Sequence, residues 1–246
     1  YSRARQIYRA AQILMSKYQG VFPSSFDEVI ALPGVGRYTA GAVCSIAWNQ
    51  PTPILDGNVT RVLARLHRIE SSTRDKKTNQ HLWALATELV SQAARLPPAS
   101  SRGNCSALNQ ALMELGALVC TPRSPLCPSC PLAGSCVARR LGKQLALPNT
   151  GPHQRMTARN FAAFVINRGN RFLVRRRPEG VHNSGLWEFP NMQTNGQRPP
   201  AKALRNNASK VGTNLDAVKL LQECFPAPAS TCEWFCDVKR SEEHTS

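Results

Sequence analysis

Four cysteines stand within one stretch of 17 residues, CTPRSPLCPSCPLAGSC, which runs from Cys120 to Cys136. The gaps between them are six, two and five residues long. Cysteines this close together either form disulfides or bind a metal centre as thiolates. The chain has 246 residues and nine cysteines, five of them scattered, which is unlike a small disulfide-rich fold. We therefore expect a metal or cluster site in a reducing compartment.

A second stretch suited to chemistry is LPGVGRYTAGAV, at residues 32–43. Pro-Gly-Val-Gly between two helical segments makes a tight hairpin whose glycines keep side chains away from the backbone. The N–H groups that open the following helix, with the helix dipole behind them, can bind a phosphate. An ordinary turn between helices is the alternative. The pattern predicts a phosphate site at the residues Gly34, Val35, Gly36 and Arg37.

An aspartate precedes the next helical pattern, in ILDGNVTRV. The side chain of Asp56 can accept backbone N–H bonds there, and the helix dipole stabilises its negative charge. One interpretation is a simple helix cap. The other is a carboxylate that stays ionised and stabilises a cationic transition state. Its place 20 residues after Gly36 favours the second interpretation.

The first 140 residues have the pattern of helices joined by short turns, with no strand-like alternation. Apolar residues recur at helical spacing, and Ser25 with Glu28 forms a capping-box pattern before the second helix. This part of the chain is therefore expected to be all-α. The expected helices cover residues 3–18, 26–32, 37–48, 57–69, 79–94 and 106–119.

The pattern changes after a linker that contains Pro and Gly. Alternating apolar residues on both sides of a turn at 168–170 predict a β-hairpin, followed by a helix at 200–222 and a strand at 231–238. The last seven residues, RSEEHTS, match a translated sequencing adapter and are excluded from the fold. The expected divisions are a helical domain at 1–140, a linker at 141–157, a partial α+β domain at 158–239 and the foreign tail at 240–246.

The net charge of +16 is spread over both parts of the chain. Residues 1–150 carry 17 Lys and Arg against 7 Asp and Glu, and residues 151–246 carry 14 against 8. Charge of this sign attracts polyanions, of which nucleic acid is the usual one. A basic protein without such a partner is the alternative.

Together these motifs resemble the helix–hairpin–helix DNA glycosylases of the endonuclease III superfamily. The segments that carry the resemblance are LPGVGRYTAGAV, ILDGNVTRVLAR, NQALMELGALVC and C-x6-C-x2-C-x5-C, in this order. The resemblance implies a [4Fe–4S] cluster bound by Cys120, Cys127, Cys130 and Cys136, with a loop that presents Arg123 to a DNA phosphate. Zinc is the alternative, although structural zinc sites usually have two C-x2-C pairs and this chain has one.

Tyr38 identifies the branch of the superfamily that the chain resembles. Members that also cut the DNA backbone carry a lysine at this position, and without its amine no Schiff base forms. Tyr38, the LDGN tetrapeptide and the second domain are similar to the MutY-type adenine DNA glycosylases. These enzymes flip out adenine mispaired with 8-oxoguanine or guanine in duplex DNA and hydrolyse its N-glycosidic bond. The resemblance assigns stabilisation of the cationic sugar to Asp56 and positioning to Tyr38 and Asn58.

The chain departs from this family in two places. The family's glutamic acid, which protonates adenine, would lie upstream of Tyr1, so we expect a fragment truncated at both ends and inactive by itself. The contexts of the four glutamates of the helical part do not match that acid: Glu28, Glu70, Glu88 and Glu114. The second domain resembles a Nudix fold but lacks the acidic hydrolase signature after Pro190, so it should not hydrolyse nucleotides.

Two other functions remain open at this stage. One is a thymine-mismatch or endonuclease III-like glycosylase, against which the Nudix-like hairpin argues. The other is a DNA-binding module without catalysis. No run of 18 apolar residues occurs, so no membrane span is expected. We expect a monomer on mispaired duplex DNA inside the cell, in the bacterial cytoplasm or nucleoid or in the eukaryotic nucleus or mitochondrion.

Overall fold

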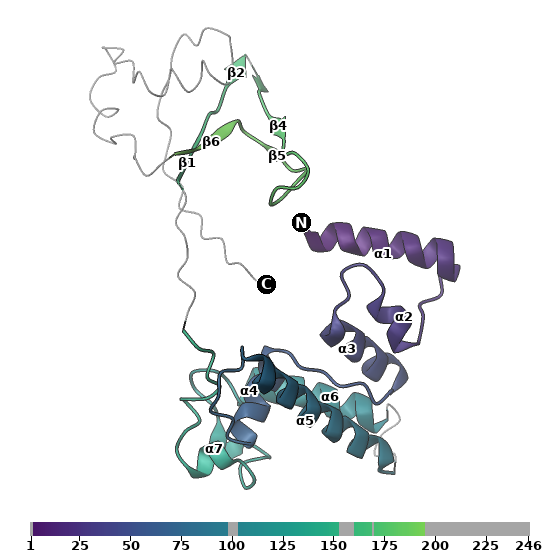
Figure 1. Ribbon diagram of the computed structural model, residues 1–246, viewed down its shortest axis with the longest axis vertical. Coiled ribbons are helices and arrows are strands. Elements are labelled where there is room, and N and C mark those ends of the chain that lie inside the picture. Colours follow the sequence, from purple (N-terminus) through teal and green to yellow (C-terminus); the bar gives the residue numbers. More distant parts are fainter. Residues whose placement is uncertain (1, 98–102, 153–159, 169, 195–246) are drawn as a thin grey trace, which may run out of the picture. The chain divides into compact units, whose positions relative to one another are not determined.

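The computed structural model describes residues 2–97, 103–152, 160–168 and 170–194. The chain divides into two compact units, Tyr1–Arg155 and Met156–Ser246 (Figure 1). The described residues of the first unit form helices and those of the second form short strands. Within the described residues, no helix is both long and apolar enough to span a membrane. The helix expected at 200–222 and the strand expected at 231–238 lie outside the described residues.

Helices and turns alternate throughout the first unit. In chain order they are α1 (Ser2–Tyr18), α2 (Phe26–Ile30), α3 (Arg37–Trp48), α4 (Gly57–Leu66), α5 (Lys76–Arg95), α6 (Asn104–Glu114), the π-helical turn η1 (Leu115–Val119), the 3-10 turn η2 (Cys127–Ser129) and α7 (Val137–Arg140). The all-α prediction for this part is confirmed, and α3 has the predicted bounds.

Three details of the helix prediction are wrong. Ser25 does stand at the N-cap of α2, but its side chain makes no capping bond, so the capping box with Glu28 does not form. Helix α4 ends at Leu66 instead of residue 69, because the backbone of Arg68 turns to a φ of 54°. The helix expected at 106–119 stops being α-helical at Glu114 and continues as the wider turn η1.

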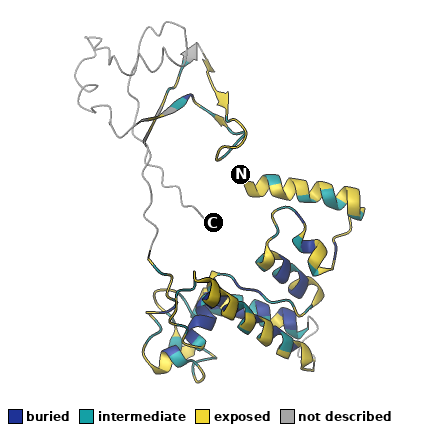
Figure 2. Cartoon of the chain, viewed as in Figure 1, coloured by how far each residue is buried: buried dark blue, intermediate teal, exposed yellow. Residues whose placement is uncertain are grey.

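Two buried clusters hold the helical unit together (Figure 2). Helices α2 and α3 bury Val29, Ala40 and Cys44 against each other. The larger cluster lies between α4, α5, α6 and the segment before α4, and it contains Ile54, Leu55, Val59, Val62, Leu63, Leu82, Ala86 and Leu112. Helix α1 has no buried residue. The larger cluster therefore fixes α4, the helix that begins after Asp56.

A buried polar contact also joins α3 to α6. The amide of Asn109 donates to the hydroxyl of Ser45 at 2.8 Å and to the carbonyl of Thr52 at 3.0 Å. Thr52 in turn donates to the carbonyl of Gly41 at 2.9 Å. A Cβ on Gly41 would lie only 2.1 Å from the carbonyl oxygen of Pro53, so only glycine permits this approach. The residues that lead into α4 are thereby held against α3.

The second unit consists of three antiparallel strand pairs in its described residues. They are β1 (Asn160–Ala163) with β6 (Asn191–Thr194), β2 (Asn167–Arg168) with β3 (Arg171–Phe172), and β4 (Arg175–Arg176) with β5 (Trp187–Glu188). The predicted hairpin is present as β2 and β3, with Asn167 opposite Phe172, but it is only two residues deep. Its first strand was predicted to begin at residue 160, whereas β1 pairs with β6 instead.

The turn η1 brings the chain unusually close to α4. A Cβ on Gly116 would lie 2.6 Å from the Cβ of Asn58 and 3.0 Å from its carbonyl carbon and oxygen. Real Cβ atoms do not approach so closely, so a side chain at this position would push α4 and η1 apart. Glycine at position 116 is therefore required by packing, and the widened turn places it there.

Replacing Gly116 with Ala should destabilise the helical unit by about 1–3 kcal/mol, the usual cost of overpacking. The measurement is the free energy of unfolding from denaturant titration followed by circular dichroism. Gly57→Ala is the matched control, because a Cβ there meets no described atom within 4 Å. Equal stability of the two variants would contradict the close packing of η1 on α4.

Candidate active site and metal centre

The predicted phosphate site is a tight hairpin between α2 and α3. Gly34 has a φ of +80°, a conformation that favours glycine, and the N–H of Val35 donates to the carbonyl of Leu32 at 3.1 Å. Gly36 is the N-cap of α3 with extended backbone, and a Cβ there would meet no described atom within 4 Å. No described neighbour therefore requires glycine at position 36. The space beside Gly36 is open, which leaves room for a ligand to approach the N-terminus of α3.

Arg37 begins α3 and lies over an aromatic ring of α5. Its guanidinium carbon is 3.9 Å from the centre of the Trp83 ring, and Trp83 itself packs on the larger buried cluster. A cation in the first turn of a helix is disfavoured by the helix dipole. The electron-rich face of the indole offsets that cost and holds the charge of Arg37 beside the hairpin.

Asp56 caps α4, as predicted. The N–H of Val59 donates to its Oδ1 at 2.7 Å. Burial raises the pKa of Tyr38, and the negative charge of Asp56 raises it further. The phenol therefore stays protonated at neutral pH. Its O–H donates to the sulfur of Met113 at 3.3 Å rather than to Asp56.

Asn58 belongs to a network built on a buried arginine. Arg61 is 8% exposed, and it donates to Asn58 Oδ1 at 2.8 Å, to the carbonyl of Gly116 at 2.6 Å and to the carbonyl of Cys120 at 2.7 Å. Burial lowers the pKa of Arg61, and the negative charge of Cys120 opposes that shift. The first turn of α4 and the first cysteine of the motif are thus joined through one guanidinium group.

Arg65, one turn further along α4, is 2% exposed and holds the segment around the first cysteine. It donates to the carbonyls of Thr121 at 2.8 Å, Pro122 at 3.1 Å and Leu147 at 2.9 Å. Its Nη1 also lies 3.3 Å from the sulfur of Cys120. A fixed positive charge therefore stands directly beside a predicted ligand.

The four cysteines of the motif line one pocket together with Arg65. They are Cys120, Cys127, Cys130 and Cys136, and all four are free thiols. Burial raises the pKa of Cys127, and the charges of the other three cysteines raise it further while Arg65 opposes the shift. In the described part of the chain, no three His, Cys, Asp or Glu side chains form a group compact enough for a single metal ion. The four thiols nevertheless line one pocket, as the ligands of a shared cluster would.

Arg123 lies in the six-residue loop between the first two cysteines. The N–H of Leu126 donates to the carbonyl of Val119 at 2.9 Å, which brings the ends of the loop together. Within the loop, the hydroxyl of Thr121 donates to the carbonyl of Ser124 at 2.7 Å. Arg123 is exposed between these two contacts. The loop therefore presents this side chain to solvent.

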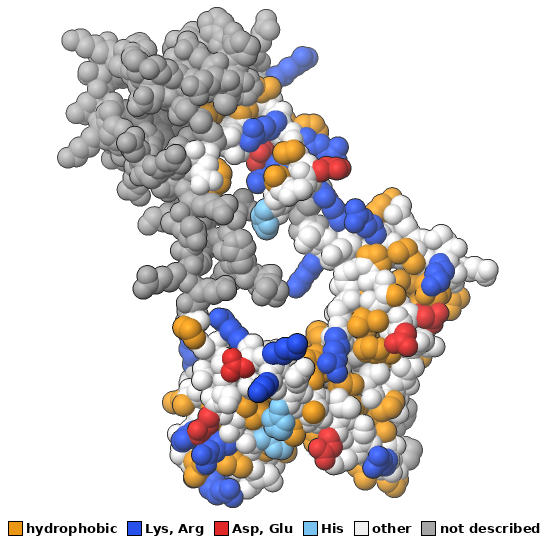
Figure 3. Space-filling model, viewed as in Figure 1, with side chains coloured by type: hydrophobic (Ala, Val, Ile, Leu, Met, Phe, Trp, Pro, Cys, Tyr) orange, Lys and Arg blue, Asp and Glu red, His pale blue; other side chains and the backbone are white. Residues whose placement is uncertain are grey.

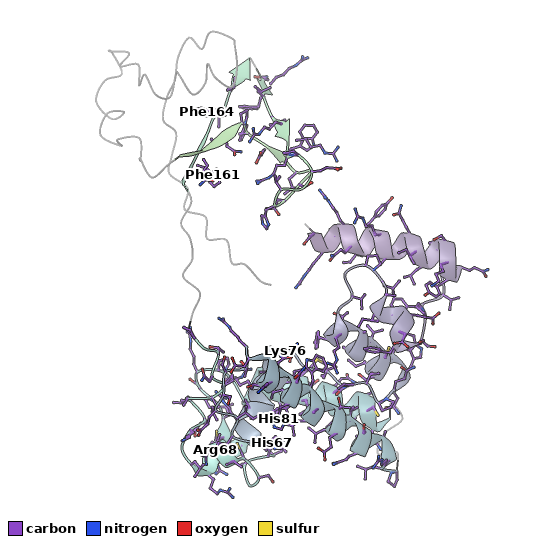
Figure 4. All side chains as sticks on the ribbon, viewed as in Figure 1. His67, Arg68, Lys76, His81, Phe161 and Phe164 are labelled. Carbon is purple, nitrogen blue, oxygen red and sulfur yellow. The ribbon has the colours of Figure 1, made fainter. Side chains whose placement is uncertain are left out.

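The surroundings of Glu70 and Glu88 do not suit a general acid. Glu70 is exposed, and its pKa is lowered by a hydrogen bond from Lys143 and by a second from Arg68, which Figure 4 labels at the end of α4. Glu88 accepts from Gln92 on the exposed side of α5. A general acid needs a raised pKa, so Glu70 in particular is excluded from that role.

Sequence reasoning missed four residues that build the site. They are Arg61, Arg65, Trp83 and Gly116. The two arginines did leave a signal, because they stand four residues apart in α4, beside the buried positions Val62 and Leu63. Charged residues on the apolar side of a helix indicate buried partners.

Two family models match this chain. Residues 17–46 match the helix-hairpin-helix motif, and residues 120–136 match the iron-sulfur binding domain of endonuclease III. Adenine DNA glycosylase of Homo sapiens is 34% identical over 238 residues, covering 78% of this chain and 42% of that protein. That of Arabidopsis thaliana is 34% identical over 225 residues, covering 86% and 34%. That of Buchnera aphidicola from Schizaphis graminum is 34% identical over 194 residues, covering 79% and 53%.

The chain is thus similar to adenine DNA glycosylases along most of its own length. It spans between about a third and about half of the length of these relatives. Among solved structures, a thermostable thymine-DNA glycosylase aligns with a TM-score of 0.47 at 30% identity, covering 56% of this chain and 59% of that chain. Because residues 120–136 match an iron–sulfur binding domain, the cofactor of the four cysteines is a [4Fe–4S] cluster. Bound there, the cluster would hold the four thiolates in fixed positions relative to one another.

Purified without oxygen, the chain should be brown and contain about four iron and four sulfide per molecule. Replacing Cys127 with Ser should remove most of the colour and the iron, measured by visible absorbance and elemental analysis. Cys44→Ala is the control, because Cys44 is buried between α2 and α3, away from the motif, and its variant should keep both. One tightly bound zinc and no colour would contradict the cluster assignment.

Proposed function

We propose that this chain is part of a monofunctional adenine DNA glycosylase and carries the residues that stabilise the cationic sugar during the reaction. The substrate class is duplex DNA with adenine opposite 8-oxoguanine or guanine, and the reaction is hydrolysis of the N-glycosidic bond. The observation that carries the proposal is the carboxylate of Asp56, which the N–H of Val59 holds at the N-terminus of α4. The residue at position 38 is a neutral phenol with a raised pKa. The identity to named adenine DNA glycosylases supports the choice of base.

Asp56 supplies the negative charge for this reaction. Breaking the bond from sugar to base leaves positive charge on the sugar, and a fixed carboxylate lowers the energy of that state. The cap bond from Val59 holds one oxygen of Asp56 in place. A phenol at position 38 cannot form a Schiff base, so the reaction stops after base removal.

The hairpin and the cysteine loop contact the DNA backbone in this proposal. The open side of Gly36 lets a phosphate approach the N-terminus of α3, and Arg37 is held beside it by Trp83. The exposed Arg123 contacts a second phosphate. Figure 3 shows that basic side chains outnumber acidic ones on the visible face of the helical unit, and a surface of this sign suits a polyanion.

The second unit acts as a Nudix-like domain that inspects the opposite base. Its described strands expose apolar and basic side chains together, including Phe161, Trp187 and Arg176. Figure 4 labels Phe161 beside Phe164 on and next to β1. Arg175 and Arg177 form ion pairs with Glu188. These pairs favour a role for the strand around Arg175 as a charged surface that faces solvent.

In a protein of the relatives' full length that contains this chain, Asp56→Asn should lower adenine release at least about 100-fold, the scale on which one electrostatic contact to a transition state acts. The amide can still cap α4 but carries no charge to stabilise the sugar. The assay uses a duplex with adenine opposite 8-oxoguanine and scores base loss after alkali, and strand cleavage without alkali should be absent.

Binding of the same duplex serves as the control for Asp56→Asn and should stay within a few-fold of the wild type. Near-full turnover in this variant would show that Asp56 only caps α4 and takes no part in the reaction. Strand cleavage by the unsubstituted protein without alkali would contradict the monofunctional assignment.

Replacing Arg123 with Ala in the present chain should weaken binding equally on matched and mispaired duplexes. Because one phosphate contact is lost, the plot of log affinity against log salt should flatten by about one unit. The matched control, Arg123→Lys, keeps the charge and should keep the slope. A loss confined to mispaired DNA would show that Arg123 reads the lesion and does not contact the backbone.

A further inference from the structure

One buried polar atom in the cysteine pocket has no partner in the described chain. The side-chain oxygen of Gln144 is inaccessible to solvent and accepts no hydrogen bond there. Gln144 lies in the turn after α7 and lines the same pocket as the four cysteines. A buried amide oxygen without a donor costs about 1–3 kcal/mol, so it calls for a reason.

The position of Gln144 is held by its neighbours in the chain. The N–H of Lys143 donates to the carbonyl of Ala138 at 2.8 Å, and the N–H of Ala146 donates to the carbonyl of Lys143 at 3.1 Å. These bonds fix the turn, but the terminal amide can rotate by half a turn without changing its shape. Rotation would place the NH2 group of Gln144, a donor, where the unpartnered oxygen now lies.

The pocket also receives a donor that cannot rotate. Arg65 donates to three carbonyls, at Thr121, Pro122 and Leu147, and these contacts hold its Nη1 at 3.3 Å from the sulfur of Cys120. Thiolate and sulfide sulfurs are electron-rich acceptors. A pocket that holds them therefore suits both the fixed cation of Arg65 and the rotated amide of Gln144.

We propose that Arg65 and Gln144 donate hydrogen bonds to the cluster sulfurs and thereby set the reduction potential of the cluster. Hydrogen bonds and positive charge near the sulfurs favour the reduced, more negative cluster, so they raise its potential. Neither residue belongs to the cysteine motif. The proposal rests on the iron–sulfur site and is independent of base excision.

The decisive variant is Gln144→Leu in the present chain, purified with its cluster. It removes the donor at nearly constant volume, so the potential measured by protein-film voltammetry should become more negative. A tenfold change in the one-electron equilibrium, about 59 mV, is the expected scale. Iron–sulfur stretching frequencies in resonance Raman spectra should also shift less on transfer to deuterium oxide than in the wild type.

Two further variants complete the test. Gln92→Leu replaces glutamine with leucine at a position on α5 whose side chain donates to Glu88. This variant should leave the reduction potential unchanged. Gln144→Glu keeps the shape and adds negative charge, so it should lower the potential further, and it decides the question if the leucine variant loses its cluster. An unchanged potential and deuterium shift in a cluster-loaded Gln144 variant would overturn the proposal, as would a wild-type chain that binds no cluster. Neither result bears on the Asp56 assay.

Discussion

The helical unit depends on satisfying two charges that are buried in its centre. Arginine does not lose its proton in proteins, so a guanidinium removed from water must find acceptors or the fold fails. Arg61 and Arg65 find no carboxylate among their described contacts and use main-chain carbonyls instead. These acceptors come from α4 itself, from η1, from the start of the cysteine loop and from the segment after α7: Gly57, Gly116, Cys120, Thr121, Pro122 and Leu147.

One short helix consequently organises both halves of the site. Asp56 caps α4, Asn58 lies in its first turn, and Arg61 and Arg65 follow at spacings of three and four residues, which place neighbours on one face of a helix. The π-helical turn η1 packs Gly116 against Asn58. It also places the carbonyl of Cys120 where it accepts a hydrogen bond from Arg61. A displacement of α4 would therefore alter the carboxylate and the cysteine pocket together.

The sequence predicted those parts of the fold that depend on local pattern. Apolar periodicity located the helices, and the bounds of α3 and the cap at Asp56 follow from single residues at their ends. Most contacts of Arg61 and Arg65 could not be predicted in the same way, because the acceptors outside α4 lie 55 to 82 residues away in the chain. The capping box failed for a related reason, since Ser25 and Glu28 can face each other without forming the bond, and short-range pattern alone does not decide it.

The pairing of Asp56 with a phenol has an electrostatic consequence for the chemistry. The cap bond from Val59 restrains the carboxylate, so its charge is already oriented before a cation develops near it. A lysine at position 38 would place an ammonium group within the field of Asp56 and neutralise part of that charge. Tyr38 remains neutral because burial and Asp56 both raise its pKa, so it leaves the field of the carboxylate intact. In the proposed reaction, a tyrosine at position 38 would thus both withhold an amine nucleophile and leave the charge of Asp56 available to the sugar.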